Sequence, residues 1–283
     1  MRVYIRPPLK WAGGKFRLLD RIRSHLPAGK RLVEPFVGSG VVFLNTDYDE
    51  YLLCDNNADL IHFYRCLLRE KRRFIDIARA FFNPDNNTQE VYAAFRERFN
   101  QLPYGMERAA LFLYLNRHGY NGLIRYNAKG AFNVPFGRYT RPGFPGKSLE
   151  AFLQKADTCS IILEICDFRE CFAMLREGDV LYCDPPYTPL SATARFTEYT
   201  GDGFGPQEQR ILASCALMAA RHGHSVLISN HDTDFTRQIY KRANVCSFRV
   251  QRSISCKTRR DAPELLAVFS PSPRHATGKE EAR

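Results

Sequence analysis

The chain has 283 residues, and its 41 lysines and arginines against 30 aspartates and glutamates give a formal net charge of +11. An apolar fraction of 45% and a charged fraction of 25% are typical of a globular protein and exclude a mainly disordered chain. The longest apolar stretch, 109–115, is far shorter than the roughly 18–20 residues of a membrane span, and the N-terminus lacks the apolar core of a secretory signal. Nine cysteines without a CxxC pair predict a reduced, cytoplasmic protein with no structural zinc.

Short apolar runs that end in a polar residue recur along the chain. They occupy residues 31–34, 51–55, 160–167, 179–184 and 225–230, and helical patterns lie between some of them, at 56–69 and 205–222. Near-continuous apolar runs of this length are typical of buried parallel strands. The alternation predicts an α/β fold with a doubly wound, mostly parallel sheet, whose carboxyl edge would carry the polar residues and bind the ligand.

The middle of the chain interrupts this alternation. Residues 88–117 have the pattern of two helices, and 117–145 form a long basic stretch rich in Gly, Asn, Pro and Tyr. We therefore expect a discontinuous catalytic domain over 1–56 and 146–270, a helical insertion over 57–145 with a basic loop at 117–145, and a disordered tail over 271–283.

The positive charge gathers in two acid-free stretches. No aspartate or glutamate lies between Glu107 and Glu150, or between Asp234 and Asp261, although lysines and arginines are frequent in both. Surfaces that serve solubility usually mix both signs. The charge pattern therefore favours a polyanionic partner such as a nucleic acid.

The first chemical motif is Val33-Glu-Pro-Phe-Val-Gly-Ser-Gly40, between a strand-like run and a run expected to be helical. Its glycines permit a tight turn and a close approach of backbone to ligand. A dinucleotide fingerprint would need a third glycine where this chain has Phe43, which argues against NAD. Asp55 ends the next strand and can accept hydrogen bonds from ribose hydroxyls, so a nucleoside-containing cofactor is favoured over a plain turn and an Asx cap.

The second motif is Asp184-Pro-Pro-Tyr187, directly after a buried strand. Two prolines fix the backbone and remove two N–H donors, which leaves the Asp184 carboxylate and the Pro185 carbonyl as acceptors beside the Tyr187 ring. This set suits a planar base that carries an amino group. The alternative, a proline-rich turn with a capping aspartate, is disfavoured by the position at a strand's carboxyl end.

Four blocks in this order resemble the DNA adenine-N6 methyltransferases, specifically the Dam-type enzymes that modify GATC. They are Leu9-Lys-Trp-Ala-Gly-Gly-Lys15, the glycine motif, residues 114–127 with 132–138, and Asp184-Pro-Pro-Tyr187. The resemblance covers about residues 8–269. It implies a class I methyltransferase fold, S-adenosylmethionine as methyl donor, duplex DNA as partner, no metal, and a monomer in the cytoplasm at the nucleoid.

The resemblance also implies the roles of site residues. Asp184, Pro185 and Tyr187 would be catalytic: hydrogen bonds from adenine N6 to Asp184 and the Pro185 carbonyl would localise its lone pair for in-line attack on the sulfonium methyl, while Tyr187 stacks on the flipped base. The cofactor-binding residues implied are Trp11, Lys15, Glu34, Phe36, Gly38, Asp55, Asp167 and Asp184.

DNA contacts are implied in the same way. Tyr120 would insert into the duplex near the vacated position, Arg125 and Lys10 would contact guanines, Leu123 and Pro135 a thymine methyl, and Asn121 the orphaned thymine. The phosphate contacts implied are Arg96, Asn127, Asn133 and Arg138.

One segment departs from the family pattern, and some alternatives stay open. Residues 252–260 stand where the family has a hairpin with glycines, but here the glycines are absent and the loop looks shorter, which leaves processivity open. Methylation of cytosine N4 would usually show serine in place of Asp184, and a DNA-binding regulator without catalysis would not need both motifs intact. Restriction-modification, mismatch repair and replication timing all remain as biological roles.

Overall fold

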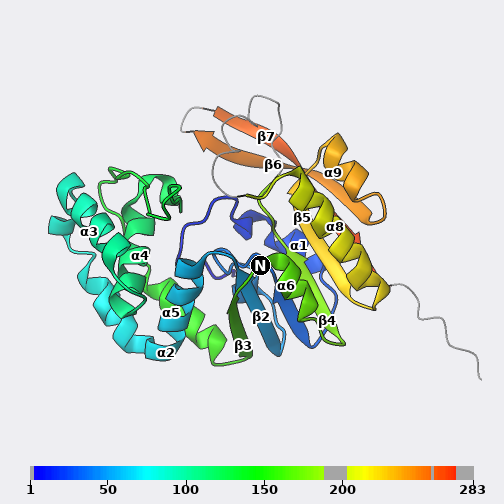
Figure 1. The fold of residues 1–283 in the computed structure, drawn as a ribbon, viewed down its shortest axis with the longest axis horizontal. Coiled ribbons are helices and arrows are strands. Elements are labelled where there is room, and N and C mark those ends of the chain that lie inside the picture. Colours follow the sequence, from blue (N-terminus) through cyan, green and yellow to red (C-terminus); the bar gives the residue numbers. More distant parts are fainter. Residues whose placement is uncertain (1–2, 188–202, 256–257, 272–283) are drawn as a thin grey trace, which may run out of the picture.

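A seven-stranded sheet with the order β3-β2-β1-β4-β5-β7-β6 forms the centre of the computed structural model, which describes residues 3–187, 203–255 and 258–271 (Figure 1). Strands β1 to β5 run parallel, whereas β7 is antiparallel to both of its neighbours. The predicted doubly wound, mostly parallel sheet is therefore confirmed. The strands are β1 (Arg31–Glu34), β2 (Glu50–Asp55), β3 (Ser160–Ile165), β4 (Asp179–Cys183), β5 (Ser225–His231), β6 (Asn244–Ser255) and β7 (Thr258–Phe269).

The two faces of the sheet are covered by different helices. Successive strand residues point to opposite faces, so Leu32 joins one apolar core and Val33 the other. The first core includes residues of α1 (Leu19–His25), α2 (Ala58–Ala80) and α5 (Gly146–Ala156). The second includes residues of α6 (Phe168–Ala173), α8 (Pro206–Arg221) and α9 (Asp234–Ile239).

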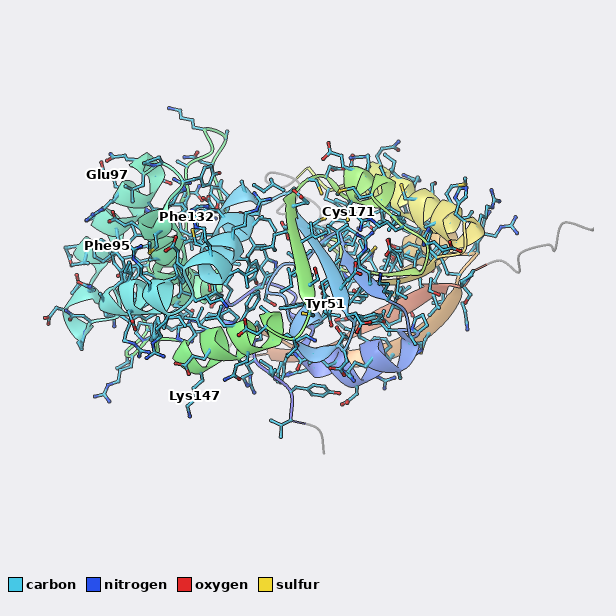
Figure 2. All side chains as sticks on the ribbon, turned by 90° about the horizontal axis from the view of Figure 1, so that it is seen from below. Tyr51, Phe95, Glu97, Phe132, Lys147 and Cys171 are labelled. Atoms are coloured by element: carbon cyan, nitrogen blue, oxygen red, sulfur yellow. The ribbon has the colours of Figure 1, made fainter. Side chains whose placement is uncertain are left out.

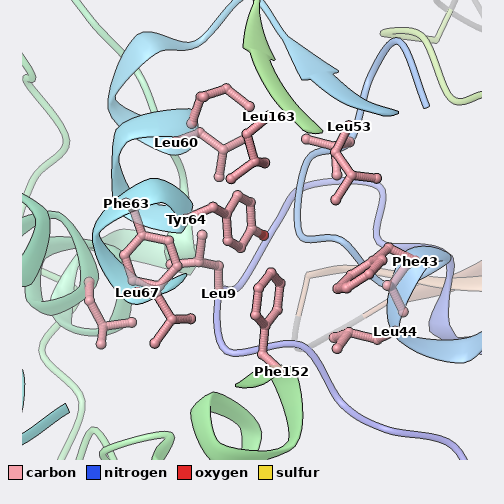
Figure 3. Packing of buried hydrophobic residues seen from close by; sticks show 14 of the residues in the cluster. Leu9, Phe43, Leu44, Leu53, Leu60, Phe63, Tyr64, Leu67, Phe152 and Leu163 are labelled. Carbon is pink, nitrogen blue, oxygen red and sulfur yellow. The ribbon is translucent and has the colours of Figure 1, made fainter. Parts of the chain in front are cut away.

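The first core also receives the N-terminal segment. Leu9 lies among its buried side chains, near the stacked rings of Tyr64 and Phe152, whose centroids are 5.0 Å apart (Figure 3). At the amino ends of β1 and β4, Arg31 and Asp179 form a buried ion pair with an N–O distance of 2.6 Å. Through Leu9, the segment before β1 thus packs on the sheet.

The insertion is helical, as predicted. Helix α2 contains a break at Lys71 (φ +47°), and α3 (Gln89–Gln101) and α4 (Met106–His118) are the two helices expected over 88–117. Helix α4 is buried on all sides over 109–115 because it packs against both α2 and α3. Figure 2 shows Phe95 and Phe132 in this part of the molecule, away from the sheet. One apolar core runs from the sheet into the insertion, so the domain boundary at 57 stays a prediction.

The helix expected after the glycine motif does not form. Residues 41–42 are a turn, and only the 3-10 helix η2 (Phe43–Asn45) follows. The side chains of Asn45 and Thr46 bond the carbonyls of Val41 and Val42, which a continuing helix would need for its own backbone. The other 3-10 helices in the described ranges are η1 (Lys15–Leu18), η3 (Pro84–Asn86) and η4 (Tyr120–Gly122).

The strands β6 and β7 form a hairpin that extends beyond the rest of the sheet. Pairing of β7 with β5 ends at His231 and Glu264, whereas pairing of β6 with β7 continues to Ser255 and Thr258. Figure 1 shows this extension on the same side of the sheet as the loops after α4. The side chains of 251–261 and the predicted tail at 272–283 lie outside what the structure describes, and none of the described helices is long and apolar enough to cross a bilayer.

Candidate active site and nucleic-acid interface

Three carboxylates stand on neighbouring strands at the carboxyl edge of the sheet. Glu34 ends β1, Asp55 ends β2 and Asp184 follows β4 directly. Because β1 pairs with both β2 and β4, the parallel register brings the three strand ends together. The three carboxylates thus lie together at the carboxyl edge, as the sequence predicted, and open α/β sheets generally bind ligands at this edge.

Asp184 is held by two donors. Its Oδ1 atom lies 2.7 Å from Lys15 Nζ and accepts a hydrogen bond of 2.9 Å from Ser229 Oγ in β5. Burial raises the pKa of Asp184, and the charge of Lys15 together with both hydrogen bonds opposes that rise. Within the described residues both bonds end on Oδ1, so Oδ2 can accept a hydrogen bond from a ligand.

The loop after Asp184 is fixed on α8 and β7. Gln209 Nε2 donates to the Pro186 carbonyl at 2.7 Å, and the Tyr187 hydroxyl donates to Glu264 Oε2 at 3.3 Å. The Tyr187 ring is faced by Lys15 Nζ at 4.5 Å from its centroid and by the His231 ring at 4.8 Å. Pro185, which follows Asp184 in the motif, is buried. The Asp184-Pro-Pro-Tyr187 motif is therefore held by hydrogen bonds with α8, β7 and β5.

The glycine motif and Asp55 form one unit. The Gly38 amide donates to Asp55 Oδ2 at 3.1 Å, and the Asn57 amide donates to Oδ1 at 3.0 Å. Gly38 has φ +47°, and a Cβ there would lie 2.8 Å from Trp11 Nε1, so the indole covers a position that only glycine can fill. Burial raises the pKa of Asp55 to about 6.

Glu34 is a buried carboxyl group with spare hydrogen-bonding capacity. Burial raises its pKa well above the usual range, the Asp184 charge raises it further, and the Phe43 backbone opposes the rise with a hydrogen bond. Its Oε1 atom has no hydrogen-bond partner among the described residues. A buried carboxyl oxygen without a partner normally costs stability, which points to a polar ligand group at this site.

The two other predicted cofactor residues lie at the ends of β1 and β3. The Phe36 ring stacks on Phe168, with a centroid distance of 5.7 Å, and meets Phe204 edge-on at 5.5 Å. Asp167 is the N-cap of α6, and its two oxygens each lie 3.0 Å from Arg169 Nη1. The Asp167 carboxylate is thus already engaged in capping and in an ion pair, whereas the Oε1 atom of Glu34 has no partner among the described residues.

Several residues at this site were not predicted from the sequence. Ser229, Gln209 and Glu264 each bond a residue of the Asp184-Pro-Pro-Tyr187 motif. The signal for Ser229 was present, since it lies in the polar end of the apolar run 225–230. Gln209 and Glu264 carry no local signal, because only the tertiary fold brings α8 and β7 against the motif.

Most of the predicted DNA-contacting residues lie on the loops that follow α4, while Arg96 lies on the neighbouring helix α3 and Lys10 on the N-terminal segment. Tyr120 is 51% exposed although it is a large aromatic residue. The exposed members are Tyr120, Asn121, Arg125, Asn127, Pro135 and Arg138, and the half-buried ones are Lys10, Arg96, Leu123 and Asn133. The surface is therefore formed mainly by one continuous stretch of the chain.

Asparagines organise this surface internally. Arg125 Nε donates to Asn133 Oδ1 at 2.8 Å and Arg125 Nη2 to the Asn133 carbonyl at 3.2 Å. Asn127 Oδ1 accepts from the Lys129 and Ala131 amides and so closes the turn between them. The side chains of Asn127 and Asn133 thus have structural partners, although both were predicted as phosphate contacts.

The two arginines predicted to contact phosphates differ in how they are held. Arg96 Nη1 donates to the Val134 carbonyl at 3.1 Å, which fixes it beneath the loop. Arg138 is exposed, and the one hydrogen bond that its side chain makes to a described residue is long, 3.4 Å to Gln89 Oε1. Arg138 is therefore the freer of the two cations.

The sequence comparisons with known proteins all point to one family. The model of the D12 class N6 adenine-specific DNA methyltransferases matches residues 11–254. A DNA adenine methylase from Vibrio cholerae is 50% identical over 266 residues, 93% of this chain and 95% of that protein. A DNA adenine methylase from Escherichia coli K12 is 49% identical over 265 residues, again 93% and 95%.

Among solved structures, the rRNA methyltransferase aviRa from Streptomyces viridochromogenes aligns with 92% of this chain and 87% of that one, at 11% identity and a TM-score of 0.41. This likeness is too distant to add to the sequence comparisons. On the strength of the family model and of relatives that match it nearly from end to end, the chain belongs to the D12 class of N6 adenine-specific DNA methyltransferases and is an adenine-specific DNA methyltransferase.

Proposed function

We propose that this enzyme transfers the methyl group of S-adenosylmethionine to adenine N6 within GATC in duplex DNA. The donor, when bound, supplies an electrophilic methyl group on a sulfonium. The GATC site is supported by the resemblance of Lys10, Leu123 and Arg125 to the family residues that read it. The single observation that carries the proposed chemistry is the state of Asp184, whose Oδ1 is occupied and whose Oδ2 is available.

The sheet edge fits an adenosyl donor. Because Gly38 has no side chain, the Trp11 indole packs directly on the glycine turn, and this ring would form one wall of the donor site. The Asp55 oxygens each take one backbone amide, so each keeps a lone pair for a ribose hydroxyl. The unpartnered Glu34 Oε1 offers a further polar contact. Phe36 would add an apolar face, and Asp167 would act through its exposed carboxylate.

Adenine N6 is a poor nucleophile because its lone pair is delocalised into the ring. Asp184 Oδ2 and the Pro185 carbonyl would each accept a hydrogen bond from one of the two N6–H groups. The lone pair would then stay localised on N6. As the new N–C bond forms and the S–C bond breaks, positive charge develops on N6, which the Asp184 carboxylate stabilises. Its Oδ2 can then receive the surplus proton. Lys15 and Ser229 favour the ionised form of Asp184 and orient it before the transfer.

The target base must leave the duplex to reach this edge, at a cost of about a few kcal/mol. We propose that Tyr187 stacks on the flipped adenine, since its ring is held by Lys15, His231 and Glu264. Tyr120 would fill the space that the base leaves, which its exposure permits.

We propose that residues 57–145 act as the recognition domain. Asn133 orients the Arg125 guanidinium, whose remaining N–H groups would contact one guanine. Lys10 would contact the other guanine of the site. Leu123 and Pro135 would contact a thymine methyl and Asn121 the orphaned thymine. Arg96, Arg138 and the hairpin turn at Asn127 would meet phosphates. The enzyme would work as a monomer on cytoplasmic DNA at the nucleoid.

The test uses labelled S-adenosylmethionine with duplexes that contain GATC, each single-base variant of it, or a scrambled site. We expect N6-methyladenine by nucleoside mass analysis, and a kcat/KM that falls about tenfold or more for each base change. A duplex with 2-aminopurine at the target position should brighten on binding as the base unstacks. Equal incorporation into GATC and scrambled duplexes, or no fluorescence change, would contradict the specificity or the flipping step respectively.

A further inference from the structure

The N-terminal segment, residues 3–15, touches both halves of the proposed machinery. Lys10 lies against the loops of the insertion, Trp11 covers Gly38, and Lys15 contacts Asp184. Only four residues therefore separate Lys10, which contacts the recognition loops, from Lys15, which contacts the catalytic carboxylate. The placement of the backbone at Lys10 therefore bears on the placement of Lys15.

Asn116 holds the backbone at Lys10. It is completely buried near the end of α4, and its Oδ1 accepts from the Lys10 amide at 2.8 Å. Its Nδ2 donates to the Lys10 carbonyl at 2.8 Å and to the Gly122 carbonyl at 3.1 Å. The two Nδ2 protons and Oδ1 are all used, so this one side chain bonds both the N-terminal segment and the recognition loop.

The contacts around Lys10 depend on the same arrangement. A Cβ on Gly122 would lie 2.4 Å from Lys10 Cβ, so the lysine stem packs directly on the glycine backbone. Lys10 Nζ donates to the Arg117 carbonyl at 3.3 Å and lies 4.1 Å from the centre of the Tyr139 ring. The Tyr139 hydroxyl accepts from the Asn121 amide at 2.9 Å, which ties the segment next to Tyr120 to the same cluster.

From this geometry we infer that Asn116 is a positioning residue that couples recognition of the DNA sequence to the catalytic carboxylate. It holds Lys10 against the recognition loop, and the chain from Lys10 to Lys15 carries that placement to Asp184. The inference rests on the proposed function, because it assumes that the loop after α4 reads the bases. It adds a residue that touches neither DNA nor methyl donor and yet sets the discrimination between cognate and altered sites.

The chain offers a matched control in Asn45, which holds the same segment with the same bonds. Asn45 Oδ1 accepts from the Ile5 amide at 2.7 Å, and its Nδ2 donates to the carbonyls of Ile5 at 2.9 Å and Val41 at 2.8 Å. Both asparagines are buried. Asn45 belongs to the sheet side, however, and contacts no residue of the insertion in the described part of the chain.

The experiment compares Asn116→Leu, Asn116→Asp and Asn45→Leu in the full-length enzyme. Leucine has a similar size but makes none of the three bonds, whereas aspartate keeps the acceptor for the Lys10 amide and sets a carboxylate against two carbonyls. For each variant we would measure thermal unfolding, the Kd for S-adenosylmethionine, and kcat/KM on GATC and on its single-base variants.

Both Asn116 variants should lower the ratio of kcat/KM between GATC and altered sites by about tenfold, the scale of one lost base contact. Any change in the Kd for the methyl donor cancels from this ratio, because both duplexes use the same donor. Asn45→Leu should lower the unfolding temperature without changing this ratio. If Asn116→Leu does not fold, Asn116→Asp alone decides the outcome. The inference is overturned if the wild type prefers GATC and the Asn116 variants keep the full ratio, or if Asn45→Leu lowers it equally. A wild type without any preference for GATC would instead refute the proposed function.

Discussion

The edge of the sheet and the loop after α4 achieve rigidity by different means. At the sheet edge, strand pairing places Glu34, Asp55 and Asp184 side by side, and few side-chain bonds are then needed. Residues 119–136 of the loop contain no strand, and their regular structure is two isolated β-bridges and the short 3-10 helix η4. Its order comes from asparagine side chains that bond backbone groups, as Asn116 and Asn127 do.

This difference predicts how each region tolerates change. A side chain on the sheet edge can be removed without moving its neighbours, because the register of the strands remains. Removing a side chain that organises the loop also changes the orientation of the residues that it bonds. Mutations at the edge should therefore affect chemistry or cofactor binding selectively, whereas mutations in the loop should spread to several DNA contacts.

The largest effect is expected for Asp184→Ala. The variant loses the acceptor for N6 and removes the carboxylate that pairs with Lys15, so kcat should fall by about 10³-fold. Binding of GATC duplexes, measured by fluorescence anisotropy, should change little because the recognition loop is untouched. A variant that still turns over at the wild-type rate would exclude Asp184 from the chemistry.

On the sheet side, stability should depend most on the buried pair of Arg31 and Asp179. Asp179→Ala strands the Arg31 guanidinium without a counter-charge, which should cost about 3–5 kcal/mol in urea unfolding. Lys30→Ala is the control, because Lys30 is 72% exposed in its contact with Glu50 and should change stability by less than about 1 kcal/mol. Equal losses of unfolding free energy in both variants would show that the buried ion pair stabilises the protein no more than the exposed one.

Specificity on the loop side should depend on Arg125. Arg125→Ala should cost about 1–3 kcal/mol of discrimination at one guanine, seen as similar kcat/KM values for GATC and for duplexes altered at that base. Asn133→Ala should act in the same direction but more weakly, since it removes only the group that orients Arg125. Uniform loss on every duplex would instead make Arg125 a phosphate contact.

The methyl-donor site should respond to pH through Asp55. The ionised carboxylate is the form that accepts bonds from ribose hydroxyls, and burial raises its pKa to about 6. Donor affinity should therefore be full above this pH and decline as the pH falls through about 6, by up to tenfold per pH unit. Calorimetric Kd values between pH 8 and 5 test this. The Asp55→Asn variant should bind the donor weakly, and its Kd should not depend on pH. A constant wild-type Kd across this interval would contradict the role.

The smallest effect is expected for Arg138→Ala. Arg138 is exposed and weakly held, so its loss should weaken all duplexes alike and reduce the slope of log affinity against log salt by about 1. A change that depends on the sequence of the duplex would assign Arg138 to base reading.

The sequence by itself determined the doubly wound sheet, the two helices of the insertion, and the candidate residues Asp55, Asp184 and Tyr187. These follow from local patterns, because buried parallel strands need continuous apolar runs and place the residue after each run at one edge. The two proline residues and the glycines of the motifs also act locally, on the backbone that carries them.

Only the tertiary structure decided which partners those residues have. The helix expected after the glycine motif gives way to a 3-10 turn because Asn45 and Thr46 bond the backbone there, and Asn45 also holds Ile5, forty positions away in the chain. Ser229 reaches Asp184, and Asn116 reaches Lys10, across separations that no spacing rule records. Hydrogen bonds between distant segments depend on how the layers pack, and a pattern read along the chain contains no information about that packing.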